Sequence, residues 1–83
     1  MSIKREDRSL SRAFGATVRV LRNEIGISQE AFAHLCGLDR TYVSLIERGI
    51  RNPTIKTVWT VAKALGKRPS ELLVRVEQEL GEG

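Results

Sequence analysis

The stretch from Ser28 to Pro53 constrains the fold of this chain more than any other part of the sequence. It contains two short amphipathic patterns that are separated by Gly37. Glycine permits a sharp turn between two helices, because it adopts left-handed backbone angles at little cost. We therefore expect two short helices that pack across a tight turn, the arrangement of a helix-turn-helix.

Glycines and prolines divide the rest of the chain into further helical segments. Gly26, Gly37, Gly49 and Gly66 each follow an amphipathic stretch, as expected of residues that end a helix. Pro53 cannot continue a helix, because it lacks a backbone N–H and forces the preceding residue into extended geometry. The pattern predicts an all-α fold of five helices without strands, at about 8–25, 28–36, 39–48, 54–65 and 69–80.

Apolar side chains recur at helical spacing in each segment, which predicts one small core. The expected core positions are, helix by helix, Leu10, Phe14, Val18, Leu21 and Ile25; Ala31, Phe32 and Leu35; Ile55, Val58, Ala62 and Leu65; and Leu72, Leu73, Val76 and Leu80. We expect residues 1–83 to form a single domain. A chain this short buries only roughly 60% of its unfolded surface, so a partner subunit would add to its stability.

Charge is distributed unevenly along the chain. The net charge is +4, but residues 70–83 carry four glutamates against one arginine, so the preceding residues hold +7. A basic body with an acidic tail is typical of a protein with one face towards a polyanion, although ordinary surface charge explains the same numbers. The mainly polar N-terminus has no signal-peptide core and no apolar run is long enough to span a membrane, which favours the cytoplasm.

The composition argues against an enzyme or a metalloprotein. The sequence has one histidine and one cysteine, His34 and Cys36, and their spacing on a helix turns them in different directions. No nucleophile–base pair and no phosphate-binding glycine loop is present. We therefore predict no catalytic residues, no metal, no cofactor and no small-molecule ligand.

The segment from Gln29 to Arg48 resembles the twenty-residue motif of the Xre family of helix-turn-helix proteins, which includes the lambdoid phage repressors. Ala33 stands fifth and Gly37 ninth in that motif, and its apolar positions are Phe32, Cys36, Leu38, Val43 and Ile46. Within the family, the sequence LDRTYVSLIERGIRNPTI resembles the controller proteins of restriction–modification systems. The resemblance implies a lambda-repressor-like fold and a small homodimer that binds paired operator half-sites.

The start of the third predicted helix carries the side chains that we expect to face the DNA bases. These are Arg40, Thr41, Tyr42 and Ser44. An arginine pairs with two acceptor atoms of guanine, and a threonine methyl contacts the methyl group of thymine. Arg40 and Tyr42 lie on phosphates and sugars in the alternative interpretation, and the role of Tyr42 stays open.

Backbone contacts to DNA are expected on either side of that helix. The resemblance implies a phosphate contact by Gln29, at the start of the second helix, where the helix dipole also favours an anion. In the loop after the third helix, polar and basic side chains are placed to bond the sugar–phosphate backbone, although a solvated loop explains them equally. They are Arg51, Asn52, Thr54 and Lys56.

Two further sets of residues have expected structural roles. The resemblance implies that Arg22 and Glu47 form an ion pair between the first and third helices. Trp59 projects to the flank of its helix, so it either packs within one subunit or lies in a dimer interface. The predicted interface consists of Trp59, Val61, Leu73, Val76 and Leu80.

These observations predict a homodimeric transcriptional regulator that binds a two-fold symmetric site in double-stranded DNA. A controller of a restriction–modification operon fits best. Two alternatives remain: an antitoxin, whose other face neutralises a toxin, and a protein–protein adaptor that has the same fold without binding DNA.

Overall fold

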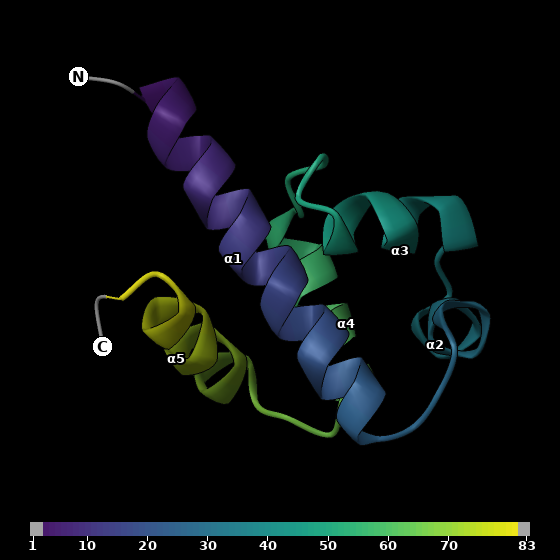
Figure 1. Cartoon of the computed structure of the whole chain (residues 1–83). Coiled ribbons are helices and arrows are strands. Elements are labelled where there is room, and N and C mark those ends of the chain that lie inside the picture. The colour runs from purple at the N-terminus through teal and green to yellow at the C-terminus, as the bar shows by residue number, and fades with distance from the viewer. Residues whose placement is uncertain (1–2, 82–83) are drawn as a thin grey trace.

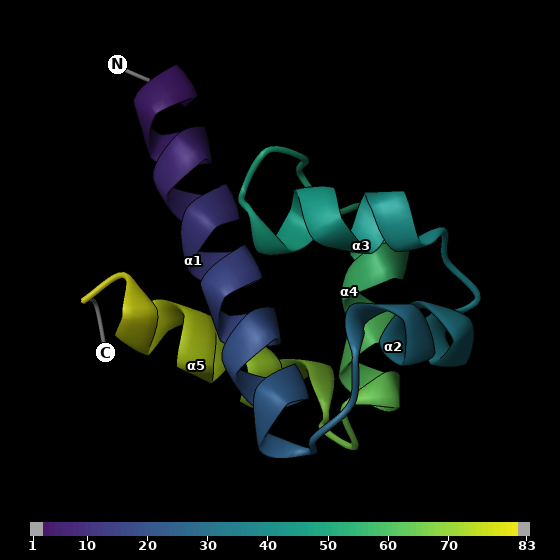
Figure 2. The ribbon, with the colours of Figure 1, turned by 45° about the vertical axis from the view of Figure 1, so that its right-hand side comes forward.

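The computed structural model describes the backbone of residues 3–81 and the side chains of residues 9–81. Its longest element is helix α1 (Ile3–Glu24), which runs diagonally through Figure 1. The other elements are α2 (Gln29–Cys36), α3 (Arg40–Glu47), α4 (Ile55–Ala64) and α5 (Pro69–Glu79). Helices α3 and α5 pack against α1 from different sides, and α4 contacts both α2 and α5 (Figures 1 and 2). The described residues therefore form an all-α bundle without strands.

Side-chain caps fix the beginning of the three short helices. Ser28 Oγ accepts a hydrogen bond from Ala31 N at 3.0 Å, and Asp39 Oδ1 accepts one from Thr41 N at 2.8 Å. Thr54 Oγ1 accepts one from Thr57 N at 3.1 Å. Each cap satisfies an amide at the helix end that has no partner within the helix. The first residues of α2, α3 and α4 are therefore fixed by side chains next to them in the sequence.

One predicted helix boundary is wrong. Helix α1 begins at Ile3, whereas the sequence pattern placed its start near residue 8. Residues 4–6 are lysine, arginine and glutamate, which all favour helix, so the helix begins earlier than expected. Every other predicted end differs from the observed one by at most one residue.

All five helices contribute side chains to the core. Its most deeply buried large side chains are Phe32, Leu72, Val18 and Val61. Several predicted core residues are exposed instead, namely Leu10, Ile25, Ala31, Leu35, Ile55 and Leu73. Most of these lie in or beside the first or last turn of a helix, where the helix extends past the small shared core.

Helix α1 and helix α3 approach each other closely at Gly15. A methyl group on Gly15 would overlap the carbonyl oxygen of Ile46 and lie 2.7 Å from that of Glu47. A second close contact follows at Gly49, where a Cβ would lie 2.8 Å from Cγ of Arg12. These glycines let α3 and the segment after it rest directly on α1.

Candidate nucleic-acid interface

The outer face of α3 carries the side chains predicted to face DNA. Arg40 and Thr41 are exposed and Ser44 is half-buried, while Val43 and Ile46 on the opposite face are each only 2% exposed. This division follows from helical periodicity, since residues 40, 41 and 44 share one face. The structure therefore presents three of the four predicted base-reading residues on one surface.

Tyr42 lies differently from those three residues. It is half-buried, and its hydroxyl lies 3.3 Å from Thr57 Oγ1, which itself lies 2.9 Å from Thr54 Oγ1. The guanidinium carbon of Arg51 lies 5.8 Å from the centre of the Tyr42 ring, a cation–π contact. Tyr42 thus links α3 to the start of α4 and to the loop between them.

An ion pair joins α1 to the end of α3. Arg22 Nε donates to Glu47 Oε2 at 2.7 Å and Arg22 Nη2 donates to Glu47 Oε1 at 3.0 Å. A third donor, Arg22 Nη1, bonds the carbonyl oxygen of Ile27 at 2.8 Å. Arg22 and Glu47 are 8% and 7% exposed. The hydrogen bond to Glu47 raises the pKa of Arg22; burial opposes this change and the charge of Glu47 adds to it.

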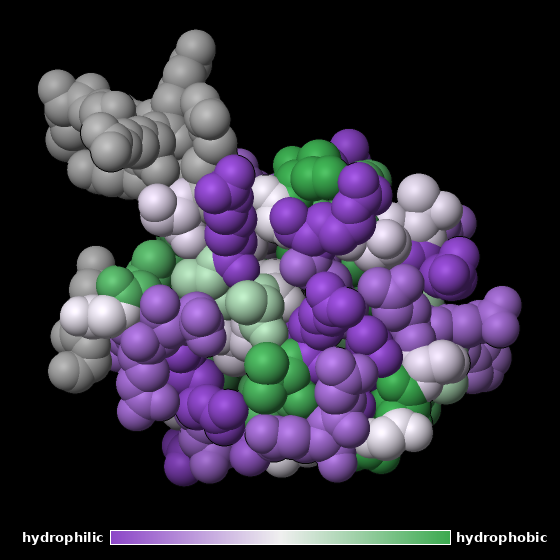
Figure 3. Space-filling model, in the orientation of Figure 1, coloured by the Kyte–Doolittle hydropathy of each residue, from purple (hydrophilic) through white to green (hydrophobic). Residues whose placement is uncertain are grey.

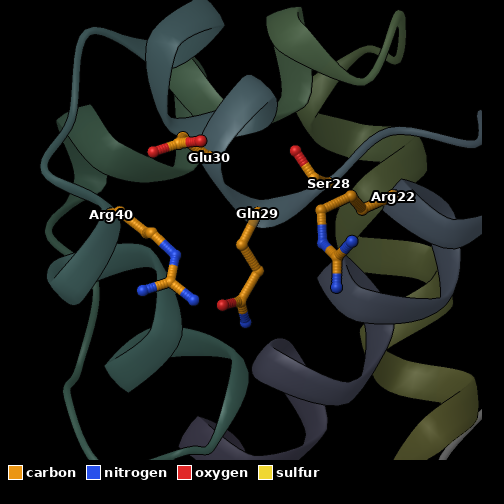
Figure 4. Close-up of a pocket in the computed structure, with 5 residues that line it drawn as sticks. All are labelled: Arg22, Ser28, Gln29, Glu30 and Arg40. Atoms are coloured by element: carbon orange, nitrogen blue, oxygen red, sulfur yellow. The ribbon is translucent and has the colours of Figure 1, made fainter.

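Gln29 extends this network towards the outer surface. Its Nε2 donates to Glu47 Oε1 at 3.0 Å, so the same carboxylate that holds Arg22 also orients the Gln29 amide. Arg22, Gln29 and Arg40 line an open pocket of about 450 Å³ together with Ser28 and Glu30. Figure 4 shows the Gln29 amide between the guanidinium groups of Arg22 and Arg40. Anion-binding groups from three helices therefore converge at the start of α2.

The loop after α3 is attached to α1. Ser11 Oγ donates to Asn52 Oδ1, which leaves the amide nitrogen of Asn52 as its remaining donor group. Arg51 and Lys56 are exposed. The Thr54 hydroxyl already has two partners, the amide and the hydroxyl of Thr57, so its role is to cap α4. The cation–π contact with Tyr42 places the guanidinium of Arg51 next to the start of α3.

The predicted dimer residues do not share one surface. Trp59 is 56% exposed and Leu73 is 42% exposed, but Val61 and Val76 are each 2% exposed and belong to the core. The prediction that Val61 and Val76 form an interface is wrong, because those sides of α4 and α5 face the interior. Leu80 is half-buried and packs against the core. Trp59 and Leu73 are the predicted interface residues that remain accessible.

Sequence reasoning missed two residues that support the candidate interface. Thr57 stands behind Tyr42, and Ser11 holds Asn52; both are buried. Neither could be found from spacing, because each partner lies on another helix or loop. Ser11 and Thr57 are both polar residues among the apolar positions of a helix, and this is the one feature of the sequence that could have indicated them.

Among residues 9–81, no cluster of three metal-binding side chains occurs. Across the part of the chain that the structure describes, no helix is long and apolar enough to cross a membrane. Cys36 is half-buried at the end of α2, and burial raises the pKa of its thiol to about 11.

The raised pKa of Cys36 predicts slow alkylation of the folded protein. The thiolate is the reactive form, so at pH 8 only about a thousandth of the thiol is reactive. The rate with iodoacetamide should rise roughly tenfold per pH unit towards pH 11. Urea-unfolded protein, with an ordinary thiol pKa near 8.5, is the control and should react much faster at pH 8. Equal rates for the two states would contradict the described burial of the sulfur.

Comparison with known proteins agrees with this geometry. A family model described as helix-turn-helix matches residues 18–72, which include α2, α3 and α4 entirely. The chain belongs to this helix-turn-helix family. Control protein C.BamHI of Bacillus amyloliquefaciens is 46% identical to it over 61 residues, which cover 72% of this chain and 75% of that protein.

Two solved helix-turn-helix structures of restriction–modification controllers are similar to the chain. C.AhdI of Aeromonas hydrophila has a TM-score of 0.72 at 45% identity, with 75% of this chain and 94% of that chain covered. C.Esp1396I, crystallised as a tetramer with its natural 35 base-pair operator, has a TM-score of 0.79 at 34% identity. That match covers 86% of this chain and 93% of the other.

Further crystal structures of C.Esp1396I are of variants altered at neighbouring positions of the chain. One replaces a threonine with alanine and another replaces the tyrosine directly after it with phenylalanine. The only threonine–tyrosine step in the present sequence is Thr41–Tyr42, at the start of α3.

Proposed function

We propose that this protein is a transcriptional regulator that binds a specific sequence in double-stranded DNA as a homodimer. The observation that carries this proposal is the outer face of α3, where Arg40, Thr41 and Ser44 stand clear of the core. The Arg22–Glu47 ion pair holds that helix against α1. The similarity to C.Esp1396I, which was crystallised with its operator, supports DNA binding by this chain.

Within this proposal, the residues divide into base readers and backbone contacts. Arg40 donates two hydrogen bonds to a guanine in the major groove, and Thr41 contacts a neighbouring base edge. Tyr42 supports the helix through the contact of its hydroxyl with Thr57. The phosphate contacts are made by Gln29, Arg51 and Lys56, with the Asn52 amide as a further donor. Thr54 caps α4 and is not among the proposed phosphate contacts.

The dimer would form through the side of the molecule that carries Trp59 and Leu73, with Leu80 at its margin. Two-fold symmetry would place the two copies of α3 about one DNA turn apart, near 34 Å, on a symmetric operator. The similarity to the controller proteins C.BamHI and C.AhdI supports control of a restriction–modification operon. Such a regulator acts in the cytoplasm, where its DNA lies, and catalyses no reaction.

The test is a binding selection from random duplex DNA at physiological salt, with the wild type and the Arg40→Ala variant. The wild type should enrich a two-fold symmetric site. The variant should lose about 10- to 100-fold in affinity for that site, since a bidentate guanine contact discriminates by roughly 1–3 kcal/mol. Binding to unrelated duplex DNA should change much less.

Arg75→Ala is the matched control, because it also removes one arginine charge. Arg75 lies on α5, on the other side of α1 from α3, and its only described pair is a 4.0 Å contact with Glu24 (Figure 1). This variant should select the same site as the wild type. A wild type that is retained without any enriched sequence would contradict specific recognition. A wild type that is not retained at all would point to a protein–protein adaptor.

A further inference from the structure

An apolar groove opens beside the accessible side of α4. It has a volume of about 250 Å³ and lies between α1, α5 and the segment that follows α3. Its apolar walls come from Leu10 and Phe14 of α1, Val58 of α4, Leu73 of α5 and Pro53 of the loop. Among residues 9–81, whose side chains the structure describes, no charged side chain lines the groove. Leu10 and Leu73 are 52% and 42% exposed at its rim, so water contacts a substantial apolar surface here.

The only tryptophan of the chain stands next to this groove. Trp59 directly follows Val58, which lines the groove, and it is 56% exposed. Ile55, one helical turn earlier on the same side of α4, is 78% exposed. A large exposed aromatic side chain beside an unfilled apolar groove is typical of an interface.

We propose that the Trp59 side chain of one copy occupies this groove on a second copy, and that the exchange is reciprocal. The proposal rests on the homodimer proposed above and specifies its central contact. An isologous two-fold interface requires a surface that is complementary to itself. Here the exposed Trp59 directly follows Val58, which lines the groove, so a two-fold rotation can pair the side chain of each copy with the groove of the other.

The size and charge of the groove suit this occupant. A cavity of roughly 150 Å³ holds a benzene ring, so 250 Å³ is enough for the two fused rings of an indole. The chain has a net charge of +4, so a contact surface without charge avoids adding to the repulsion between two copies. Among residues 9–81, the polar lining of the groove consists of the neutral residues Ser11 and Asn52.

The proposed contact also includes the loop that follows α3. Pro53 and Asn52 form one wall of the groove, and Asn52 is held to α1 by Ser11. Arg51, a proposed phosphate contact, directly precedes that wall. A partner indole packed against Pro53 therefore supports the loop from which Arg51 extends, so dimerisation and DNA binding favour each other.

The first experiment measures dimer dissociation by sedimentation equilibrium and, in parallel, the tryptophan emission of the intact protein over the same concentrations. Burial of Trp59 in the groove should shift its emission to the blue as the dimer forms. Trp59→Ala and Leu10→Glu should each raise the dimer Kd about 30-fold or more, as expected at the centre of an interface. Leu10→Glu tests the groove specifically, because Leu10 lies on α1 and not on α4 or α5.

Leu35→Glu is the matched control for Leu10→Glu. Leu35 is 61% exposed on α2 and does not line the groove, so this variant adds the same charge elsewhere and should leave the Kd unchanged. Circular dichroism melts establish that each variant is folded. The second experiment needs no variant: isotope-filtered NMR of a mixed dimer should show magnetisation transfer from the Trp59 indole of one copy to the Phe14 ring of the other.

The outcomes separate this proposal from the proposed function. A wild-type dimer without the Trp59–Phe14 transfer would overturn the groove contact and leave the homodimer standing. A dimer in which Leu10→Glu binds as tightly as Leu35→Glu would also overturn it. A protein that stays monomeric at all concentrations, both free and on DNA, would overturn the groove contact and the homodimer together.

Discussion

Gly15→Ala should lower the free energy of unfolding by about 3 kcal/mol, the upper end of the usual range for an overpacked core. The added methyl group would overlap the carbonyl oxygen of Ile46 and lie 2.7 Å from that of Glu47. Both atoms belong to the backbone of α3, so no side-chain rotation relieves the overlap and α3 must move away from α1. Urea denaturation followed by circular dichroism measures the change.

The sign of this effect is the decisive part of the prediction. In an ordinary helix interior, glycine to alanine stabilises by roughly 0.5–1 kcal/mol, because alanine has less conformational freedom to lose on folding. A stabilised Gly15→Ala variant would therefore show that α1 and α3 are not in contact as described. Gly66→Ala is the control for backbone strain alone, since Gly66 has φ +70° and open space around a Cβ. It should cost only about 1–2 kcal/mol.

Glu47→Ala should destabilise the protein by about 3–5 kcal/mol, the range found when one member of a buried ion pair is removed. Arg22 would remain buried with its charge uncompensated, and Gln29 would lose its acceptor. DNA affinity should fall further than the loss of stability explains, because Gln29 is then free to rotate. Chemical denaturation and DNA titration under conditions where the variant is folded measure the two effects.

The double variant Arg22→Met/Glu47→Leu distinguishes the charge from the packing. Replacing a buried pair with apolar residues is often neutral for stability, so much of the lost stability should return. Gln29 would still lack its acceptor, and DNA affinity should stay low. Arg75→Ala, which breaks the exposed pair with Glu24, should change stability by less than ~0.5 kcal/mol. A Glu47→Ala variant as mild as Arg75→Ala would contradict the described network.

The local features of the fold could be predicted from the sequence because their causes are local. Capping side chains such as Ser28 and a turn glycine such as Gly37 act within a few residues, and the helix ends that they set were found to within one residue. Cooperative extension of a helix is less local, which is why α1 starts at Ile3 and not near residue 8.

Burial was harder to predict, because it depends on how helices are turned towards one another. Leu35 was predicted in the core and Val61 at a dimer interface, yet Leu35 is 61% exposed and Val61 is 2% exposed. Contacts between distant residues were also beyond the sequence pattern. The Arg22–Glu47 pair, 25 residues apart, was expected only from the resemblance to a family, and the Ser11–Asn52 contact was not expected at all.

The glycine contact between α1 and α3 also has a consequence for changing what the protein recognises. Because the backbone of α3 rests on α1 at Gly15, the position of α3 does not depend on the side chains that point outward. Libraries that vary Arg40, Thr41 and Ser44 should therefore yield folded proteins with new operator preferences. The outward side chains of α3 can then be exchanged while its backbone stays in place, and one parent protein can yield a set of regulators that each bind a different operator.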